Sequence, residues 1–263
     1  MSDIKIGVAM SVYNKGAFVA TNLNIFESVW ENLTPHVAVC CNDTATREKL
    51  SLLNIDTLVP GNDYEVNSKN DLRLRQYDCI KKSVSAAAVG TDYVIHWHAD
   101  AFALDENAVL NMAHQMRNAG ALFAGRGLWQ SYPCSKTPNG DIDDHFFMAN
   151  SAHIRNSGIY SDDMIDEVKK MILAGMCSEG ILATLVQKFT DANDILIYSD
   201  MSKCEVLETT RHDYRYSDGI PHRTLPPVNF DRSRKFLHCD DMNHLHRIFM
   251  ELEIDPKLIV AQL

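Results

Sequence analysis

The stretch HWHADAF, at 96–102, places two histidines and an aspartate within five positions, as His96, His98 and Asp100. It directly follows the apolar run Tyr93-Val94-Ile95. Imidazole and carboxylate groups are ligands of divalent metal ions, and an imidazole can also hydrogen-bond a polar ligand or exchange a proton near neutral pH. The spacing therefore predicts a metal or ligand site at the end of a strand.

Counted from His96, the stretch is similar to the H-x-H-x-D-H zinc signature of metallo-β-lactamase-type hydrolases. The sixth residue of that signature is a histidine ligand, and here it is Ala101. The chain also continues as AFALDENAVLNMAHQM, straight into a predicted helix, where the hydrolases have a Gly-rich turn. A zinc hydrolase using His96, His98 and Asp100 is therefore an alternative that lacks one ligand.

The composition bounds the kind of protein. Lys and Arg number 25 against 35 Asp and Glu, a formal net charge of -10, and no basic run is interleaved with aromatic residues, which argues against nucleic acid as a partner. The sequence shows neither a signal-peptide pattern nor a window of about 18 apolar residues, so no integral membrane span is predicted. Seven cysteines without a C-x-x-C pair are typical of reduced thiols. We expect a soluble, cytoplasmic protein.

Apolar β-rich runs alternate with amphipathic segments along the chain. Strands are expected at 4–12, 36–43, 56–59, 93–97, 121–125 and 194–200, and helices at about 17–31, 44–53, 70–88, 105–118, 161–174 and 179–190. This order predicts an α/β fold with a mostly parallel sheet flanked by helices. Because ligands of such sheets bind at the carboxyl ends of the strands, HADAF falls where a site is expected.

Two further expectations concern packing and the end of the chain. In the helix at 70–88, the residues expected in the core are Leu72, Ile80, Val84 and Ala87. From residue 202 the pattern weakens, and a helical segment follows Asp240. The tail is expected to wrap the site or to contribute an oligomer contact, which would make the protein a homo-oligomer.

Residues 4–102 resemble the GT-A-fold glycosyltransferases, most closely the inverting family 2 enzymes. AMSVYNKGAF is similar to their opening strand and loop "P-x-Y-N-x", and CCNDTATREKL to their second strand with its "D-x-S/T" turn. RLRQYDCIKKSVSAAAVGTDYVIHWHADAF is similar to the stretch that ends in "D-A-D". The resemblance implies a GT-A-like (Rossmann-like) catalytic domain at 1–200, with a nucleotide-sugar-binding half at 1–102, an acceptor half at 103–200, and a C-terminal extension at 201–263 that closes over the site.

The resemblance also implies roles for individual residues. A divalent cation, Mn²⁺ or Mg²⁺, is implied at the diphosphate, but His98 stands where the family commonly carries Asp. That departure leaves open whether Arg and Lys replace the cation. Arg73 is a rival of Arg75. The implied contacts are Tyr13 and Asn14 with the base or ribose, Asp43 with the base edge, Arg75 with the base or phosphates, His98 with the ribose or metal, and Asp100 and His238 with the metal.

An inverting transfer needs a carboxylate that removes the proton of the acceptor hydroxyl. In the resembled family this base begins a helix in an "E-D-x-x-L" context, and the nearest match here is Glu179, in CSEGIL. Ser178 could cap that helix, and Glu179 could then be a first-turn carboxylate favoured by the helix dipole. Asp144, in DDHFFMAN, is the second candidate base.

Together these features predict a glycosyltransferase of polysaccharide biosynthesis. It would move a sugar from a nucleoside diphosphate sugar donor to a hydroxyl of a glycan or glycolipid acceptor, with inversion. The alternatives are a metal-dependent nucleotidyltransferase, a zinc hydrolase that uses His96, His98 and Asp100, and a non-catalytic sugar-nucleotide-binding protein.

Overall fold

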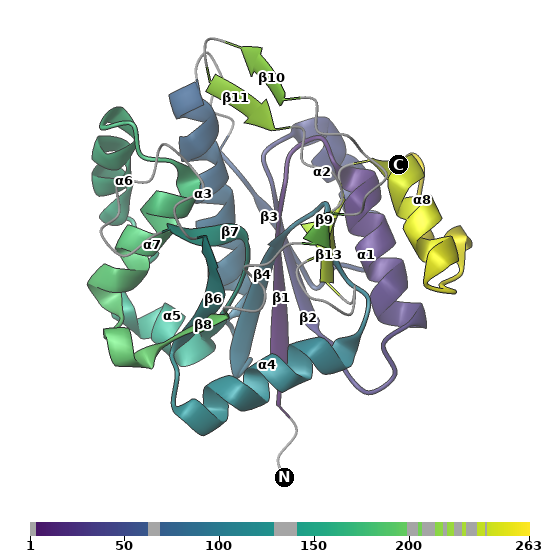
Figure 1. Cartoon of the computed structure of the whole chain (residues 1–263), viewed down its shortest axis with the longest axis horizontal. Helices are drawn as coiled ribbons and strands as arrows, with labels where there is room; N and C mark the ends of the chain where they lie inside the picture. Colours follow the sequence, from purple (N-terminus) through teal and green to yellow (C-terminus); the bar gives the residue numbers. More distant parts are fainter. Residues whose placement is uncertain are drawn as a thin grey trace.

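The protein folds around a seven-stranded sheet, seen at the centre of Figure 1. The computed structural model describes residues 4–62, 69–128, 141–198, 205–206, 214–217, 220–223, 228–229, 236–239 and 241–263. Within these residues, no helix combines the length and the apolar character needed to cross a bilayer.

Six of the strands in the main sheet are parallel and one, β7, runs against them. The strand order is β3-β2-β1-β4-β7-β6-β8. The predicted α/β fold with a mostly parallel sheet is confirmed. The strands are β1 (Ile6–Val12), β2 (His36–Cys41), β3 (Thr57–Pro60), β4 (Tyr93–His98), β6 (Phe123–Leu128), β7 (Asp141–Asn150) and β8 (Ile195–Tyr198).

Helices cover both faces of the sheet. Figure 1 shows α1, α2, α4 and α8 around one side and α3, α5, α6 and α7 around the other. The helices are α1 (Gly16–Ser28), α2 (Thr44–Leu50), α3 (Lys69–Ala87), α4 (Glu106–Ala119), α5 (Ser151–Ser157), α6 (Met164–Leu173), α7 (Ser178–Phe189) and α8 (Met242–Glu251), with short 3-10 turns at Ala192–Asp194 and Pro256–Leu258.

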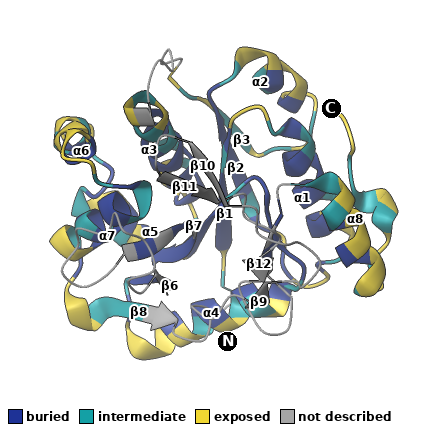
Figure 2. Cartoon of the chain, turned by 45° about the horizontal axis from the view of Figure 1, so that its top comes forward, coloured by how far each residue is buried: buried dark blue, intermediate teal, exposed yellow. Residues whose placement is uncertain are grey.

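The core is divided into two layers by the alternation of side chains along the strands. In β1, Val8 and Met10 pack into the layer under α1, α2, α4 and α8, whereas Ala9 packs under α3. Figure 2 shows the central strands as a buried band between partly exposed helices. Ile80, Val84 and Ala87 of α3 are buried as expected.

The expectation for Leu72 is wrong, because its side chain is 47% exposed. Leu72 lies in the first turn of α3, three residues before Arg75, and Arg75 already contacts Tyr13 beyond the end of β1. The first turn of α3 therefore stands past the carboxyl edge of the sheet, where there is no strand for Leu72 to cover.

The C-terminal part of the chain returns to the middle of the protein. A second sheet has the order β5-β13-β12-β9, and β13 pairs antiparallel with β5, directly after HWHAD. The predicted helix near the end of the chain is confirmed as α8. The short strands are β5 (Ala101–Ala103), β9 (Glu205–Val206), β10 (Tyr214–Ser217), β11 (Ile220–Arg223), β12 (Val228–Asn229) and β13 (Phe236–His238).

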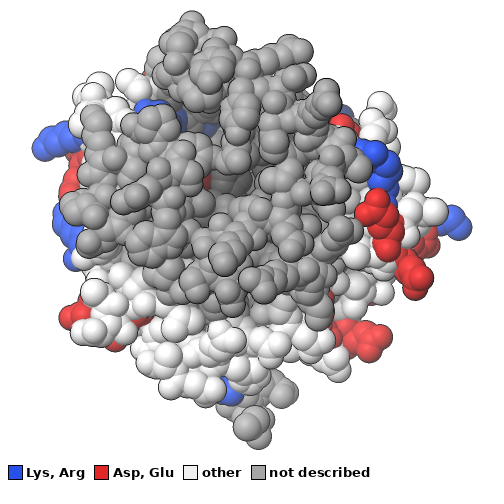
Figure 3. Space-filling view, in the orientation of Figure 1, with Lys and Arg blue, Asp and Glu red and all other residues white. Residues whose placement is uncertain are grey.

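On the face of the protein seen in Figure 3, the described Lys and Arg side chains at the margins lie among Asp and Glu side chains. The described charges in that view are therefore mixed in sign.

Candidate functional site

Three adjacent strand ends bring the predicted site residues together. The strands β1, β2 and β4 are parallel neighbours, so Tyr13, Asp43 and His98, at or just past the ends of these strands, all lie at the same edge of the sheet. HADAF therefore begins at the carboxyl edge of the central strands, as the sequence predicts. That edge is the usual place for ligands in α/β sheets.

Tyr13 and Arg75 form a stacked pair at this edge. The Arg75 guanidinium lies over the Tyr13 ring, with its central carbon 3.8 Å from the ring centroid. Arg75 is buried while Tyr13 is 51% exposed. Asn14 follows with a backbone φ of 56°, the left-handed conformation that Asn tolerates better than most residues, and so turns the chain from β1 toward α1. The result is an exposed aromatic ring backed by a positive charge.

Asp100 lies in a turn that is held from two sides. The side-chain amide of Asn22 in α1 donates to the carbonyl oxygens of Ala99 (2.9 Å) and Ala101 (3.1 Å), and the Cys239 N–H donates to the Asp100 carbonyl oxygen (2.8 Å). The Asp100 carboxylate forms an ion pair with the Lys15 ammonium. Lys15 stands immediately before α1, so the loop after β1 supplies the counter-charge of a buried carboxylate.

His98 is connected to Asp144 through Gln76 of α3. The Gln76 Nε2 atom donates to Asp144 Oδ2 at 2.7 Å and lies 3.4 Å from His98 Nε2. The antiparallel direction of β7 explains this meeting. Trp97 pairs with Phe146, so the beginning of β7, with buried Asp144, lies beside the end of β4.

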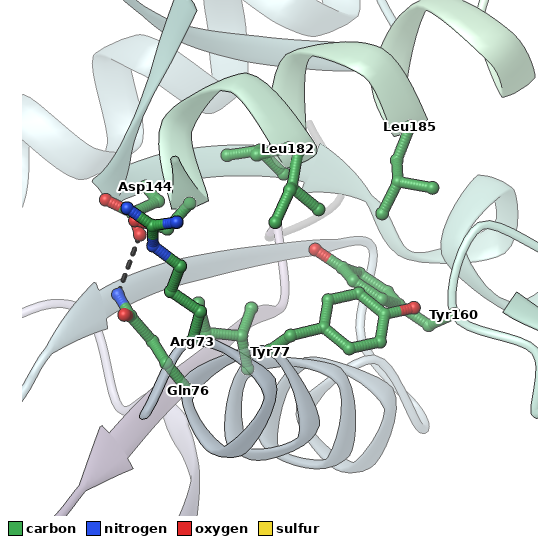
Figure 4. Close-up of a pocket in the computed structure, with 10 residues that line it drawn as sticks. Arg73, Gln76, Tyr77, Asp144, Tyr160, Leu182 and Leu185 are labelled. Carbon is green, nitrogen blue, oxygen red and sulfur yellow. Dashed lines mark hydrogen bonds between the residues drawn. The ribbon is translucent and has the colours of Figure 1, made fainter. Parts of the chain in front are cut away.

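A small cavity of about 20 Å³ opens beside Asp144, between α3, β7 and α7. Figure 4 shows Arg73, Gln76 and Asp144 at one end, and two tyrosine rings beneath Leu182 and Leu185 at the other. A cavity of this size admits one water-sized group. The full lining is Arg73, Gln76, Tyr77, Ile80, Asp144, Tyr160, Ser178, Ile181, Leu182 and Leu185.

The two tyrosines, Tyr77 and Tyr160, are buried, with ring centroids 6.2 Å apart. Burial raises the pKa of both phenols, so both hydroxyls keep their protons. Neither hydroxyl has a hydrogen-bond partner among the described residues. Both can therefore donate to a polar group that enters the cavity.

The two arginines that the sequence left as rivals serve different places. Arg75 stacks on Tyr13, whereas Arg73 lines the cavity with Asp144. They are two positions apart on α3, which turns their side chains toward different sides of the helix.

Asp43 is engaged by the backbone. It is the N-cap of α2, and its Oδ2 accepts the N–H of Thr46 at 2.9 Å. A hydrogen bond from the Thr46 side chain is the largest cause of its lowered pKa, and partial burial opposes it. Asp43 therefore stands at the predicted edge, while its carboxylate already stabilises a helix end.

Glu179 lies in the first turn of α7, beside the cavity residue Ser178. The predicted cap by Ser178 is wrong. Cys177 holds the N-cap position without a side-chain cap, and the Ser178 hydroxyl donates to Glu179 Oε2 at 3.1 Å. The structure thus brings Asp144 into hydrogen-bonded contact with Gln76, and places Glu179 one residue from the same cavity.

The predicted metal ligands His98, Asp100 and His238 lie on neighbouring backbone segments, since His238 pairs with Ala101 across β13 and β5. The side chain of His238 is outside the described residues. Within the described part of the chain, no group of three His, Cys, Asp or Glu side chains is arranged to hold a metal ion. The Asp100 carboxylate, the hardest ligand of the set, is paired with Lys15. The described side chains therefore do not fit a divalent cation.

His96 does not join the edge cluster. Its side chain is fully buried, with its ring 5.1 Å from that of Phe147 and 5.7 Å from that of His98. A zinc ion shared by His96, His98 and Asp100 would require these three side chains to converge on one point, and no such group of three is found among the described residues.

Lys15 and Gln76 contact the predicted residues Asp100 and Asp144, and sequence reasoning did not select either of them. Lys15 stands in the same loop as Tyr13 and Asn14, and Gln76 directly follows Arg75. Their closeness in sequence to predicted residues was a signal. Their partners, Asp100 and Asp144, are 85 and 68 residues away, and only the folded sheet brings them together.

No protein-family model matches the chain, and no curated protein sequence matches it. Several solved structures are similar to it. An active-site mutant of LgtC aligns over 94% of both chains, with 13% identity and a TM-score of 0.49. Mouse xyloside xylosyltransferase 1 aligns over 76% of this chain and 86% of its own, with 12% identity and a TM-score of 0.45.

A CMP:2-keto-3-deoxy-manno-octonic acid synthetase, solved with CTP, aligns over 74% of this chain and 89% of its own, with 10% identity and a TM-score of 0.41. These similarities are low in both sequence and structure, so the function proposed below depends on the geometry of the site.

Proposed function

We propose that this protein is a glycosyltransferase that moves a sugar from a nucleoside diphosphate sugar to a hydroxyl of a glycan or glycolipid acceptor, with inversion. The observation that carries the proposal is the order of groups along one sheet edge. An exposed aromatic ring, a lysine–aspartate pair and a buried carboxylate follow one another there, as Tyr13, Lys15 with Asp100, and Asp144.

The first part of this edge suits a nucleoside. A base can stack on the exposed face of Tyr13, because the other face is covered by Arg75. Asn14 follows the end of β1 and His98 ends β4, the neighbouring strand, so we assign the ribose to these two side chains. Asp43 is given no contact with the base in this arrangement, because its carboxylate already accepts the Thr46 N–H at the start of α2.

The middle of the edge suits a diphosphate. Lys15 provides ammonium N–H donors at the start of α1, where the backbone N–H groups of a helix also favour an anion. As the bond between the sugar and the diphosphate breaks, the leaving oxygen takes the electron pair and gains negative charge. A cationic group at this place stabilises that charge.

The last part suits the acceptor hydroxyl. Asp144 is buried, and its Oδ2 is held by Gln76, which fixes the direction of the carboxylate. The adjoining cavity is the size of one oxygen-bearing group. We propose that Asp144 takes the proton of the acceptor hydroxyl while that oxygen bonds to the sugar carbon, opposite the departing diphosphate. Glu179, the first candidate from the sequence, is the alternative base, since it lies next to Ser178 of the cavity lining.

The test is a thermal-shift screen of the purified protein against zinc alone and against UDP, GDP, dTDP and CMP, each nucleotide with Mn²⁺ and with EDTA, followed by turnover of the matching sugar donor. A ligand at about 100 times its dissociation constant adds about 2.7 kcal/mol to the free energy of unfolding. We expect one nucleoside diphosphate to raise the melting temperature and its sugar conjugate to be consumed when an acceptor is present.

Other outcomes of the screen would contradict the proposal. Stabilisation by zinc alone would favour the hydrolase. Pyrophosphate release from a nucleoside triphosphate and a sugar phosphate would favour nucleotidyl transfer. Nucleotide binding without donor turnover by any acceptor would indicate a sugar-nucleotide-binding protein.

A further inference from the structure

The ion pair between Lys15 and Asp100 occupies the place where the sequence predicts a metal ion. The Asp100 side chain is 7% exposed and that of Lys15 is 40% exposed. The ammonium therefore covers the carboxylate from the solvent side of the edge. The Phe18 ring supports it from α1, with its centroid 5.7 Å from Lys15 Nζ.

This arrangement satisfies the charge of Asp100 without a metal. A buried carboxylate is stable in its ionised form only when a positive group or several hydrogen bonds compensate it. Lys15 supplies that compensation from within the chain. A divalent cation at the same carboxylate would stand beside the ammonium, and the repulsion between the two positive charges would oppose its binding.

The sequence carries a second sign of the same kind. The D-A-D stretch of the resembled family has two acidic residues. In this chain His98 stands at the first of these two positions and Asp100 at the second. The described site thus offers one carboxylate where the motif has two, and that carboxylate is already paired. Both differences lower the negative charge that would attract a divalent cation.

We propose that Lys15, oriented by Asp100, neutralises the donor diphosphate in place of a divalent cation, so that nucleotide binding is independent of metal. This proposal rests on the proposed function. An ammonium has three N–H donors, so Lys15 can keep one bond to Asp100 and direct the others to phosphate oxygens. Asp100 then acts as a positioning residue.

The experiment measures binding of UDP, GDP, dTDP and CMP by isothermal titration calorimetry, in EDTA and in MnCl₂. The wild-type protein is compared with two variants, Lys15→Met and Lys188→Met. Lys188 is a matched control, because its side chain is 44% exposed, pairs with Glu167 and lies 5.4 Å from the Phe189 centroid.

The wild-type protein is expected to bind one of these four nucleotides in EDTA with a dissociation constant within threefold of that in MnCl₂. Lys15→Met should weaken that binding in EDTA at least tenfold, and Lys188→Met should leave it unchanged. Wild-type binding that appears only with MnCl₂, or Lys15→Met binding as tightly as wild type in EDTA, overturns this proposal alone. No binding in either buffer overturns the proposed function and this proposal with it.

Lys15→Met leaves the Asp100 carboxylate buried beside an apolar side chain, which can unfold the protein. The double variant Lys15→Met/Asp100→Asn removes both charges and avoids that cost. It should melt near the wild-type temperature and still lose binding in EDTA at least tenfold. A double variant that is folded and binds normally in EDTA overturns the proposal.

Discussion

Polar residues lie at both ends of strand β4, but their side chains have different hydrogen-bond partners at the two ends. At the amino end, the Asp92 carboxylate accepts the Lys5 N–H at 2.8 Å, and the Thr91 hydroxyl donates to the Ala87 carbonyl at 2.8 Å. These side chains bond to backbone groups and fix the loops around the strand. They are structural bonds, which a ligand could replace only by loosening the fold.

At the carboxyl end, three of the side-chain contacts join side chains from distant elements. Lys15 pairs with Asp100, and Gln76 joins His98 to Asp144. Bonds of this kind can be exchanged for bonds to a ligand while the backbone stays in place. The carboxyl end is therefore the end suited to binding and chemistry.

Cavity size alone would point to the amino end of β4, the opposite end from the site proposed above. The cavity at the amino end has about 310 Å³, against about 20 Å³ beside Asp144. Yet of the two arginines that line the larger one, Arg155 donates to the Ala88 carbonyl and Arg117 contacts His114. The two ends of β4 are therefore distinguished by the hydrogen-bond partners of their polar side chains more than by the volumes of their cavities.

The largest effect is expected at Asp144. Asp144→Asn keeps the shape and the contact with Gln76 but removes the base, so turnover should fall by roughly 10²–10⁴-fold. Nucleotide binding and the melting temperature should change little. Steady-state kinetics with the donor identified by the screen would measure this, with Asp166→Asn, at a site 82% exposed on α6, as the control.

Glu179→Gln is the companion variant. If Asp144 is the base, this change should lower turnover less than tenfold. The reverse result, a large loss in Glu179→Gln with near-normal Asp144→Asn, would move the base to the start of α7 and remove Asp144 from the chemistry.

The second effect is expected at Tyr13. Stacking of a base on an aromatic side chain contributes about 1–3 kcal/mol, so Tyr13→Ala should weaken nucleotide binding roughly 5- to 150-fold. Tyr13→Phe keeps the ring and should bind nearly as wild type. Leu72→Ala, at a position of similar exposure on α3, serves as the control. Equal binding by wild type and Tyr13→Ala in calorimetry would place the base elsewhere.

The alternation of strands and helices could be predicted from the sequence because it depends on local periodicity. The position of HADAF follows from the same pattern. These residues come directly after an apolar strand, so they must lie at its carboxyl end, where ligands of parallel sheets bind. The parallel part of the sheet therefore needed no long-range information.

The contacts within the site could not be predicted in the same way. The link from His98 to Asp144 depends on the antiparallel direction of β7 and on its register with β4, in which Trp97 meets Phe146. No short stretch of sequence encodes that register. Leu72 failed for a related reason, because the helical pattern does not show where the sheet beneath a helix ends.

A smaller effect is expected at the amino end of β4. Thr91→Val removes the hydroxyl that bonds to the Ala87 carbonyl and lies 2.9 Å from the Ser151 hydroxyl. Loss of such a bond costs about 1 kcal/mol in the free energy of unfolding, measurable by urea denaturation. Nucleotide binding should be unchanged. A tenfold loss of binding would show that this end is coupled to the site and would end the distinction between the two ends.

The smallest effect on nucleotide binding and on stability is expected at Asp43. This residue tests the contrast between the two ends of β4 with a carboxyl-end residue. Asp43 lies at the carboxyl edge but bonds to the backbone, as the amino-end residues do. If the hydrogen-bond partner of a side chain decides whether it binds ligand or stabilises the fold, Asp43→Asn should leave nucleotide binding unchanged. It should alter the free energy of unfolding at pH 7 by only a few tenths of a kcal/mol, since Asn caps helices as well as Asp.

The pH dependence of stability separates the two roles of Asp43. Its pKa is lowered in the folded protein, chiefly by the Thr46 side chain, so its ionised form stabilises the fold above the unfolded pKa, and that contribution is lost as the pH falls through the folded pKa. Urea denaturation between neutral pH and about pH 3 should therefore show a steeper loss for wild type than for Asp43→Asn. A tenfold weaker nucleotide affinity in Asp43→Asn at neutral pH would instead mean that the carboxylate contacts the base, because the cap itself survives the substitution.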